Sequence, residues 1–505
     1  MSFPSVFGRQ ARAFFAGGLP LRTLALLLVL SWPAAAQQGP ALGLRDVIEL
    51  ALNQSAVARQ AVVNRETSYW QYRAYQSGYR PQLALQGTLP NYNRVITPVV
   101  QPDGTTDFRA VRINNANVGV TLTQAIGPTG AQLYVSSAVQ RFDDFNRSAR
   151  LYNNQPVGIG LTQPIGRFNS LRWARKIEPL RYEESGRQYV EERETIAQRS
   201  TELYFDVLLQ QVNADVAGQN VRANEEMRRL GQERFRLGRL SQSDLLLLEL
   251  NLLNSRRAFG QARIDADNAA LSLRAYTGQP TGAPRLTVPA AAPALAVAAD
   301  LALAQARQNR RETLAFRRRL LQAESDVAQA RGSTGFQATL QASLGYVNSA
   351  QNFWTTYNNP QNQQQVSLAF AMPLVDWGRQ KSVVKTAELS RQQVQQTVAQ
   401  EQVTFEQTVV LQATQLGSLQ EQLSLSAQAD SLAQRRYDIA QATYKVGRIS
   451  LTDLNIALAE KDQAKRAYIA ALRACWVAHY RLRALTLYDF ELQQPLVASG
   501  EGAKW

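Results

Sequence analysis

The sequence predicts a mixed α and β membrane protein with an internal two-fold repeat. Three observations support this prediction: segments of strict polar and apolar alternation, helical runs over residues 167–237 and 380–446, and a motif that recurs at a fixed spacing. Alternation with a period of two is typical of strands with one apolar face. Helical runs of this size reach roughly 100 Å, which is too long for an ordinary globule.

The N-terminus has the composition of an export signal. Arg9, Arg12 and Arg22 precede a short apolar run at residues 24–30, and a run of three alanines follows. A charged region, an apolar region and a small-residue cleavage site define a signal peptide, which we place at residues 1–36. The apolar run is too short to cross a membrane, and no later stretch is long enough either. We therefore expect an exported mature chain without a transmembrane helix.

Composition argues against catalysis and against cofactors. The chain has one cysteine, Cys475, and one histidine, His479, both in a helical run. A metal cluster, a disulfide framework and most nucleophilic triads need more of these residues, so we expect no catalytic, cofactor or metal site. The formal charge of +15 is of the sign that nucleic acid attracts. An exported protein rarely meets nucleic acid, and we expect no such partner.

A motif that occurs twice organises the chain. Residues 238–245 match residues 447–454 at an offset of 209, and the same offset aligns more than a hundred residues without a gap. A weaker match upstream has an offset of 255, which leaves 255 − 209 = 46 extra residues in the first copy, between about 90 and 160. A repeat at a fixed offset indicates duplicated structure. Each copy is predicted to run helix, strands, very long helix and shorter helix.

These matches divide the chain into five parts. After the signal peptide, residues 37–280 form repeat 1 and residues 299–490 form repeat 2. The Pro- and Ala-rich residues 281–298 are expected to be an irregular linker between them. Residues 491–505 form a C-terminal tail.

Alternating segments predict two strands in repeat 2 and at least two in repeat 1. In the clearest segment the apolar residues share one face: Phe336, Ala338, Leu340, Ala342, Leu344 and Tyr346. A membrane barrel and a half-buried soluble sheet both show this alternation. The connecting loop favours the membrane barrel, because it is polar and contains three aromatic residues, Phe353, Trp354 and Tyr357. Aromatic residues form girdles at the membrane interface in such barrels.

One chain cannot close a barrel with these strands. It supplies about four core strands and an extra hairpin around residues 117–142. Open strand edges cannot face lipid, so other copies must complete the wall. Three chains giving about twelve strands would close it. The sequence leaves open whether the extra hairpin extends the barrel or projects from it.

The helices are predicted to form long hairpins. Shorter returning helices are expected at 241–276 and 450–487, and entering helices at 44–78 and 299–331. Apolar residues recur every seven positions along the long runs, at Leu209, Val216, Ala223, Leu230 and Leu237 and at Leu425, Leu432, Ile439 and Val446. Sustained heptads predict coiled-coil packing against neighbouring helices.

Each long helix is expected to turn back at a glycine. Gly238 and Gly447 suit the left-handed conformation that ends a helix, and Ser241 and Ser450 suit the cap of the next helix. The acid three residues after each serine then falls in the first turn, where the helix dipole stabilises a carboxylate.

These residues resemble the TolC-type outer-membrane efflux family, the outer membrane factors. The resemblance is carried by the two tip segments, 235–245 and 444–454, and by residues 372–379, where strand gives way to helix. It implies a homotrimer with a 12-stranded outer-membrane β-barrel continued by a long α-helical periplasmic barrel. It also implies a place in the cell outer membrane, extending into the periplasm, and contact with outer-membrane lipid. The implied partners are a periplasmic adaptor protein and an inner-membrane transporter, for which the channel is a passive, gated conduit.

The resemblance also implies two kinds of site at the helical tips. Candidates for the periplasmic constriction are Asp453, Asp244 and Tyr444, and candidates for contact with the adaptor are Gly238, Arg239, Ser241, Gly447, Arg448 and Ser450. Asp453 matches an acid that lines the constriction in the family, although Ile456 stands where a second acid is common. Tyr444 and Asp244 match polar contacts between hairpins, although the basic partner falls at Ile449. A gating role and a capping role for the two aspartates both stay open.

Two other classes of protein share some of these features, a periplasmic adaptor and a coiled-coil surface stalk. Alternating strands with aromatic loops argue against the adaptor. The stalk is disfavoured because the chain lacks lengthy low-complexity repeats and has glycine turns in mid-chain.

Overall fold

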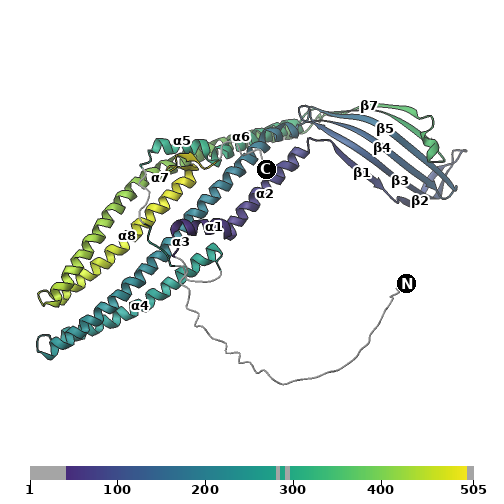
Figure 1. Ribbon diagram of the computed structural model, residues 1–505. Helices are drawn as coiled ribbons and strands as arrows, with labels where there is room; N and C mark the ends of the chain where they lie inside the picture. The colour runs from purple at the N-terminus through teal and green to yellow at the C-terminus, as the bar shows by residue number, and fades with distance from the viewer. Residues whose placement is uncertain (1–40, 280–284, 290–295, 498–505) are drawn as a thin grey trace, which may run out of the picture.

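The computed structural model describes residues 41–279, 285–289 and 296–497. The predicted signal peptide lies outside these ranges, as do parts of the predicted linker and tail. The described chain forms an elongated molecule with a β-sheet at one end and the tips of two helical hairpins at the other (Figure 1). The prediction of a mixed α and β architecture is confirmed.

A single antiparallel sheet forms the first end. Its strands are β1 Gln82–Thr88, β2 Tyr92–Val100, β3 Thr106–Ile126, β4 Ala131–Asp144, β5 Ala149–Ile165, β6 Gln337–Ala350 and β7 Gln361–Ala371. They lie in the order β1-β3-β4-β5-β6-β7. β1 and β2 both pair with β3, β1 along residues 117–123 and β2 along residues 106–114, so they lie end to end. The sheet therefore has six strand positions across.

β3 and β4 lie within residues 90–160, where the sequence comparison placed the extra residues. These strands meet at a turn over residues 127–130, where the sequence predicted an additional hairpin. β3 pairs with β4 without a break in register, and β4 pairs in turn with β5. The hairpin is thus part of the sheet. A 12-stranded barrel from three chains needs four strand positions per chain, two fewer than the six positions of this sheet.

One face of the sheet is apolar across its strands. Leu83 of β1 lies opposite Leu122 of β3, which lies opposite Val135 of β4, and the row continues through Ile159 of β5 to Leu344 of β6. This face is open in the single chain, because Leu83 is 71% exposed and Leu344 is 60% exposed. A half-buried soluble sheet would cover such a face, so the exposure favours a wall in lipid.

The helices form two hairpins of matching size. The long helices α3 Ser170–Arg236 and α7 Arg379–Lys445 have 67 residues each. The returning helices α4 Gln242–Thr277 and α8 Leu451–Thr486 have 36 residues each. All four pairs of bounds differ by 209, and each long helix spans about 100 Å. Within the part of the chain that the structure describes, no helix is both long and apolar enough to cross a membrane.

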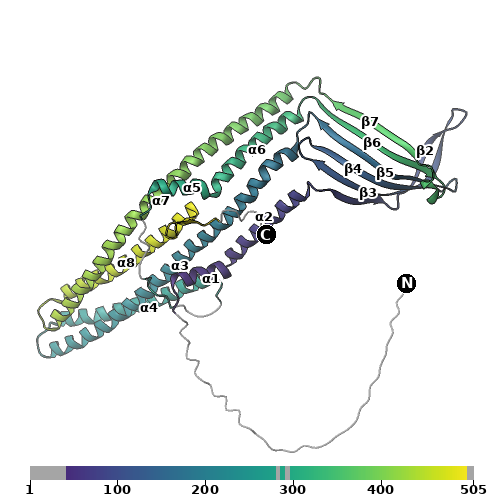
Figure 2. The ribbon, with the colours of Figure 1, turned by 45° about the horizontal axis from the view of Figure 1, so that its top comes forward.

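The entering helices are each divided in two, and on this point the prediction from sequence was wrong. They are α1 Leu44–Gln54 with α2 Ala56–Ser77, and α5 Ala299–Asn309 with α6 Arg311–Ser333. Ser55 is extended, and its hydroxyl accepts a hydrogen bond from the backbone N–H of Ala58 at 3.0 Å, which caps α2. Arg310 is also extended, and its guanidinium lies 2.9 Å from a carboxylate oxygen of Glu191 on α3. The two breaks let the short helices pack against the long ones at mid-height (Figure 2).

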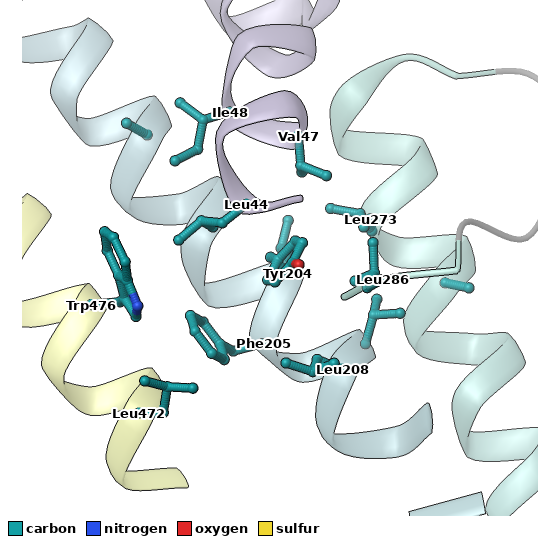
Figure 3. Packing of buried hydrophobic residues seen from close by; sticks show 14 residues of the cluster. Leu44, Val47, Ile48, Tyr204, Phe205, Leu208, Leu273, Leu286, Leu472 and Trp476 are labelled. Carbon is teal, nitrogen blue, oxygen red and sulfur yellow. The ribbon is translucent and has the colours of Figure 1, made fainter. Parts of the chain in front are cut away.

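An apolar cluster at this height joins the hairpins. Tyr204 and Phe205 of α3 are fully buried among side chains of α1, α4 and α8 (Figure 3). Leu286 packs in the same cluster, and residue 287 accepts a hydrogen bond from the Tyr204 hydroxyl. The cluster therefore fixes the described part of the linker to the helices at the middle of the molecule.

Candidate functional site

The first hairpin turns at Gly238. Its φ is +69°, and its N–H donates to the carbonyl of Phe235 at 2.9 Å. Arg239 then donates its backbone N–H to the carbonyl of Arg234 at 2.8 Å. The Ser241 hydroxyl accepts from the backbone N–H of Asp244 at 3.0 Å, and so caps α4. The predicted order of left-handed glycine, capping serine and first-turn acid is confirmed here.

The second hairpin repeats this geometry at Gly447, whose φ is +79°. Ser450 caps α8, because its hydroxyl accepts from the backbone N–H of Asp453 at 3.1 Å. The Asp453 carboxylate accepts in return from the Ser450 hydroxyl at 2.7 Å and from the Ser450 N–H at 3.3 Å. Hydrogen bonds from the Ser450 hydroxyl and then the Ser450 N–H lower the pKa of Asp453. Asp453 therefore carries a charge that completes a capping box.

The tips present the adaptor candidates to solvent. Gly238, Arg239, Gly447 and Arg448 are exposed, and so are the capping serines. Asp453 is exposed too, whereas Asp244 is half-buried. The turns thus offer backbone and guanidinium groups at the end of the molecule farthest from the sheet (Figure 1).

Tyr444 lies in a different environment from the other candidates. It is 4% exposed and packs with Leu248, Tyr437 and Leu454 in an apolar cluster between the two hairpins. Burial raises the pKa of its hydroxyl, the positive charge of Arg234 opposes this rise, and the negative charge of Asp244 adds to it. In the single chain, Tyr444 is thus a packing residue between the hairpins.

A basic residue that the sequence did not single out joins the hairpins. Arg234 of α3 donates from Nη2 to the backbone carbonyls of Tyr444 at 3.2 Å and Lys445 at 3.0 Å. Its guanidinium carbon lies 5.4 Å from the centre of the Tyr444 ring. These carbonyls end α7, where the helix dipole attracts a cation. A second link runs from Lys445 Nζ to Glu226 Oε1 at 3.0 Å.

The resemblance left this network without a basic residue, because the family's basic position falls at Ile449, next to Arg448. In the structure a cation from the opposite hairpin, Arg234, lies against the end of α7. Arg234 donates to main-chain carbonyls, and a motif of side chains does not reveal such acceptors. The available signal in the sequence was the pair of basic residues in the last turn of α3, Arg234 and Arg236.

The sole cysteine and the sole histidine of this chain are inaccessible. Cys475 is fully buried and His479 is 3% exposed, both in the helical layer at mid-height. Burial, followed by the charge of Arg483, lowers the pKa of His479 to about 4. Among the described residues, no cluster of three or more His, Cys, Asp or Glu is placed to hold a metal ion.

Comparison with solved structures shows which proteins share this fold. The fold is similar to the CmeC outer membrane channel of Campylobacter jejuni, with a TM-score of 0.65 and 15% identity over 90% of this chain and 87% of that one. It is also similar to the outer membrane protein VceC of Vibrio cholerae, with a TM-score of 0.62 and 16% identity over 88% and 96% of the two chains. The open MtrE outer membrane channel of Neisseria gonorrhoeae gives a TM-score of 0.59 and 16% identity over 88% of each.

The class defined by this fold is therefore an antiparallel sheet continued by long helical hairpins, as in these outer membrane proteins. Residues 302–486 match the family described as outer membrane efflux protein, which confirms the resemblance read from the tip motifs. No curated protein sequence matches the chain.

Proposed function

We propose that this protein is the outer-membrane channel of a tripartite efflux or secretion system, a passive gated conduit from the periplasm to the exterior. The observation that carries the proposal is an open sheet with one continuous apolar face, joined end-on to two hairpins about 100 Å long. The sheet fits lipid, and the hairpins are long enough to carry the conduit deep into the periplasm. The sole histidine and the sole cysteine are buried, and the proposal includes no catalytic step.

A trimer is supported by surfaces that the single chain leaves uncovered. The sheet ends at β1 and β2 on one side and at β7 on the other, and unpaired strand edges cannot stand in lipid. Along α7 and at its C-cap the heptad residues are exposed by 60–68%, at Leu425, Leu432, Ile439 and Val446. A second copy would cover both the edges and this stripe, and cyclic symmetry would close the ring.

The domain division is part of the proposal. Residues 37–280 and 299–490 act as two repeats on either side of the linker, and the 209-residue spacing of α3 with α7 and of α4 with α8 supports this duplication. The exposed turns at Gly238 and Gly447 are the proposed contacts for a periplasmic adaptor, which would connect the channel to an inner-membrane transporter.

The proposed constriction is a ring of Asp453 from the three copies. Exposure of the carboxylate at the tip supports this assignment, and its role in the capping box is compatible with it.

Asp453→Asn removes the charge but keeps an acceptor for the cap, whereas Asp453→Ala removes both. If the ring restricts the pore, both variants change conductance and cation block. The control Asp438→Ala removes an equal charge from the exposed surface of α7 and should leave conductance unchanged. A change in the alanine variant alone would assign Asp453 to the cap and not to the gate.

The first experiment measures oligomer mass and single-channel conductance of the detergent-extracted mature protein in a planar bilayer. A heat-sensitive trimer with a small conductance that cations reduce is the expected result. A water-soluble monomer without conductance would contradict the proposal and favour the periplasmic adaptor or the surface stalk.

A further inference from the structure

We propose that the membrane barrel closes with eighteen strands, six from each of three chains, because the β3–β4 hairpin forms part of the wall. The inference rests on the proposed trimeric outer-membrane channel. It replaces the twelve strands expected from the resemblance, which would follow if the hairpin stood outside the wall.

The first argument is strand pairing. β3 and β4 pair continuously over fourteen residue pairs, from Ile113 opposite Asp144 to Ile126 opposite Ala131. On its other sides the hairpin pairs with β1 and β2 through β3, and with β5 through β4. β1 and β5 therefore have the hairpin between them and do not pair with each other. Lifting the hairpin out would break the ladders to β1, β2 and β5 and leave two new open edges in lipid.

The second argument is the continuity of the two faces. Val135 of β4 lies on the apolar face, between Leu122 of β3 and Ile159 of β5. The neighbouring residue Ser136 lies on the other face, between Thr121 and Gly158. The hairpin thus shows the same apolar and polar sides as the strands around it. β3 and β4 have 21 and 14 residues, more than the roughly 9–11 that a tilted transmembrane strand needs.

The third argument is the anchoring of the hairpin turn. Asn169, which caps α3, donates from Nδ2 to the carbonyls of Gly127 at 2.9 Å and Pro128 at 3.1 Å. Gln163 of β5 donates from Nε2 to the carbonyl of Thr129 at 3.1 Å. Gln124 of β3 donates from Nε2 to the carbonyl of Tyr79, just after α2, at 2.9 Å. These hydrogen bonds hold the turn at the junction between the sheet and the helices. This is the end of the sheet at which strands of a barrel wall reverse direction.

Close packing on the polar face supports the same placement. The ring of Tyr134 on β4 lies over Gly160 on β5, so closely that a Cβ at Gly160 would fall 2.2 Å from Tyr134 Cζ. Any side chain at Gly160 would require the Tyr134 ring to move, and the two residues are opposite each other in the ladder. The hairpin is thus fitted to β5 by side chains as well as by hydrogen bonds.

A wider barrel follows from the strand number. The diameter of a barrel grows roughly linearly with the number of strands, so eighteen strands give about 1.5 times the diameter of twelve. Barrels of 16–18 strands leave an aqueous channel. The outer part of the conduit would then admit bulkier solutes than a twelve-stranded barrel, while the helical tips would set the narrowest point.

The test uses single cysteines in the trimer reconstituted into liposomes, probed with a charged maleimide. Val135→Cys and Ser136→Cys report on the two faces of the hairpin, and Leu344→Cys and Ser343→Cys are the matched pair on β6. The native Cys475 is buried, so the unsubstituted protein supplies the background. We expect Ser136→Cys and Ser343→Cys to react at least tenfold faster than Val135→Cys and Leu344→Cys, respectively.

Each outcome has a distinct meaning. If the β6 pair shows this contrast while both hairpin cysteines react freely, the hairpin is outside the wall and the eighteen-strand count is wrong. If the β6 pair shows no contrast either, the sheet is not a membrane wall and the proposed function fails with it. Native mass spectrometry supplies a second check, since a dimer would close twelve strands from this sheet and would overturn the count.

Discussion

At the residue scale, burial in the helical layer changes the pKa of His479. The imidazole contacts the rings of Trp476 and Tyr480, and burial is the main reason that its pKa falls to about 4. In the unfolded chain the pKa of a histidine is about 6.5. As the pH falls below that value, the unfolded state binds a proton that the folded state does not. The free energy of unfolding therefore decreases between about pH 6.5 and pH 4.

We predict that His479→Gln weakens this pH dependence. A difference of about 2.5 pKa units corresponds to about 3 kcal/mol at pH 4, lost progressively from pH 6.5. The measurement is the temperature of heat dissociation of the oligomer from pH 7.5 to 4.5 for both proteins. Equal slopes for wild type and variant would show that His479 does not contribute to acid sensitivity.

Arg234 is a second single-residue determinant, because it links the hairpins at their tips. Arg234→Ala removes two hydrogen bonds to the carbonyls that end α7, which together contribute about 2 kcal/mol. We predict that the hairpins separate more readily and that closed-channel conductance rises in a planar bilayer. Arg236→Ala is the control, because Arg236 is exposed and pairs with Glu233 of its own helix. An equal rise in both variants would assign the effect to net charge and not to the link.

At the scale of the elements, the two hairpins depend on glycine where the helix reverses. Gly447 has a φ of +79°, which costs an L-residue about 1–2 kcal/mol. Gly417 lies within α7 and has open space where a Cβ would project. We predict that Gly447→Ala lowers the dissociation temperature, whereas Gly417→Ala raises it slightly, because alanine favours a helix interior by about 0.5–1 kcal/mol. Equal effects at the two positions would contradict the role of the left-handed turn.

At the scale of the whole molecule, the proposed trimer would place the exposed stripe of α7 in its interface. Leu432 is 64% exposed in the single chain, and the proposed trimer would cover it. Leu432→Glu places a charge in that interface, so we predict a loss of trimer in native mass spectrometry. Gln434→Glu adds the same charge two residues away, which is on the opposite side of the helix, and should leave the trimer intact. A stable Leu432→Glu trimer would show that this stripe lies outside the interface.

The sequence alone determined the features that depend on local or periodic information. The bounds of α3, α4, α7 and α8 lie within a few residues of those expected. Heptads and helix caps depend on residues close together in the sequence, so both can be recognised without the fold. The tip turns at Gly238 and Gly447 followed from the same local chemistry. The alternating strands also followed, since a pleated strand places every second side chain on one face.

The tertiary structure decided what depends on partners far apart in the chain. Arg234 meets carbonyls more than 200 residues away, and Arg310 meets Glu191 at a separation of 119 residues, so neither contact could be read from local patterns. The same holds for the hairpin of β3 and β4, whose alternation fitted both a projecting and an integral position. Only its ladders to β1 and β5 place it within the sheet, because strand order is set by long-range hydrogen bonds that the period of a strand does not encode.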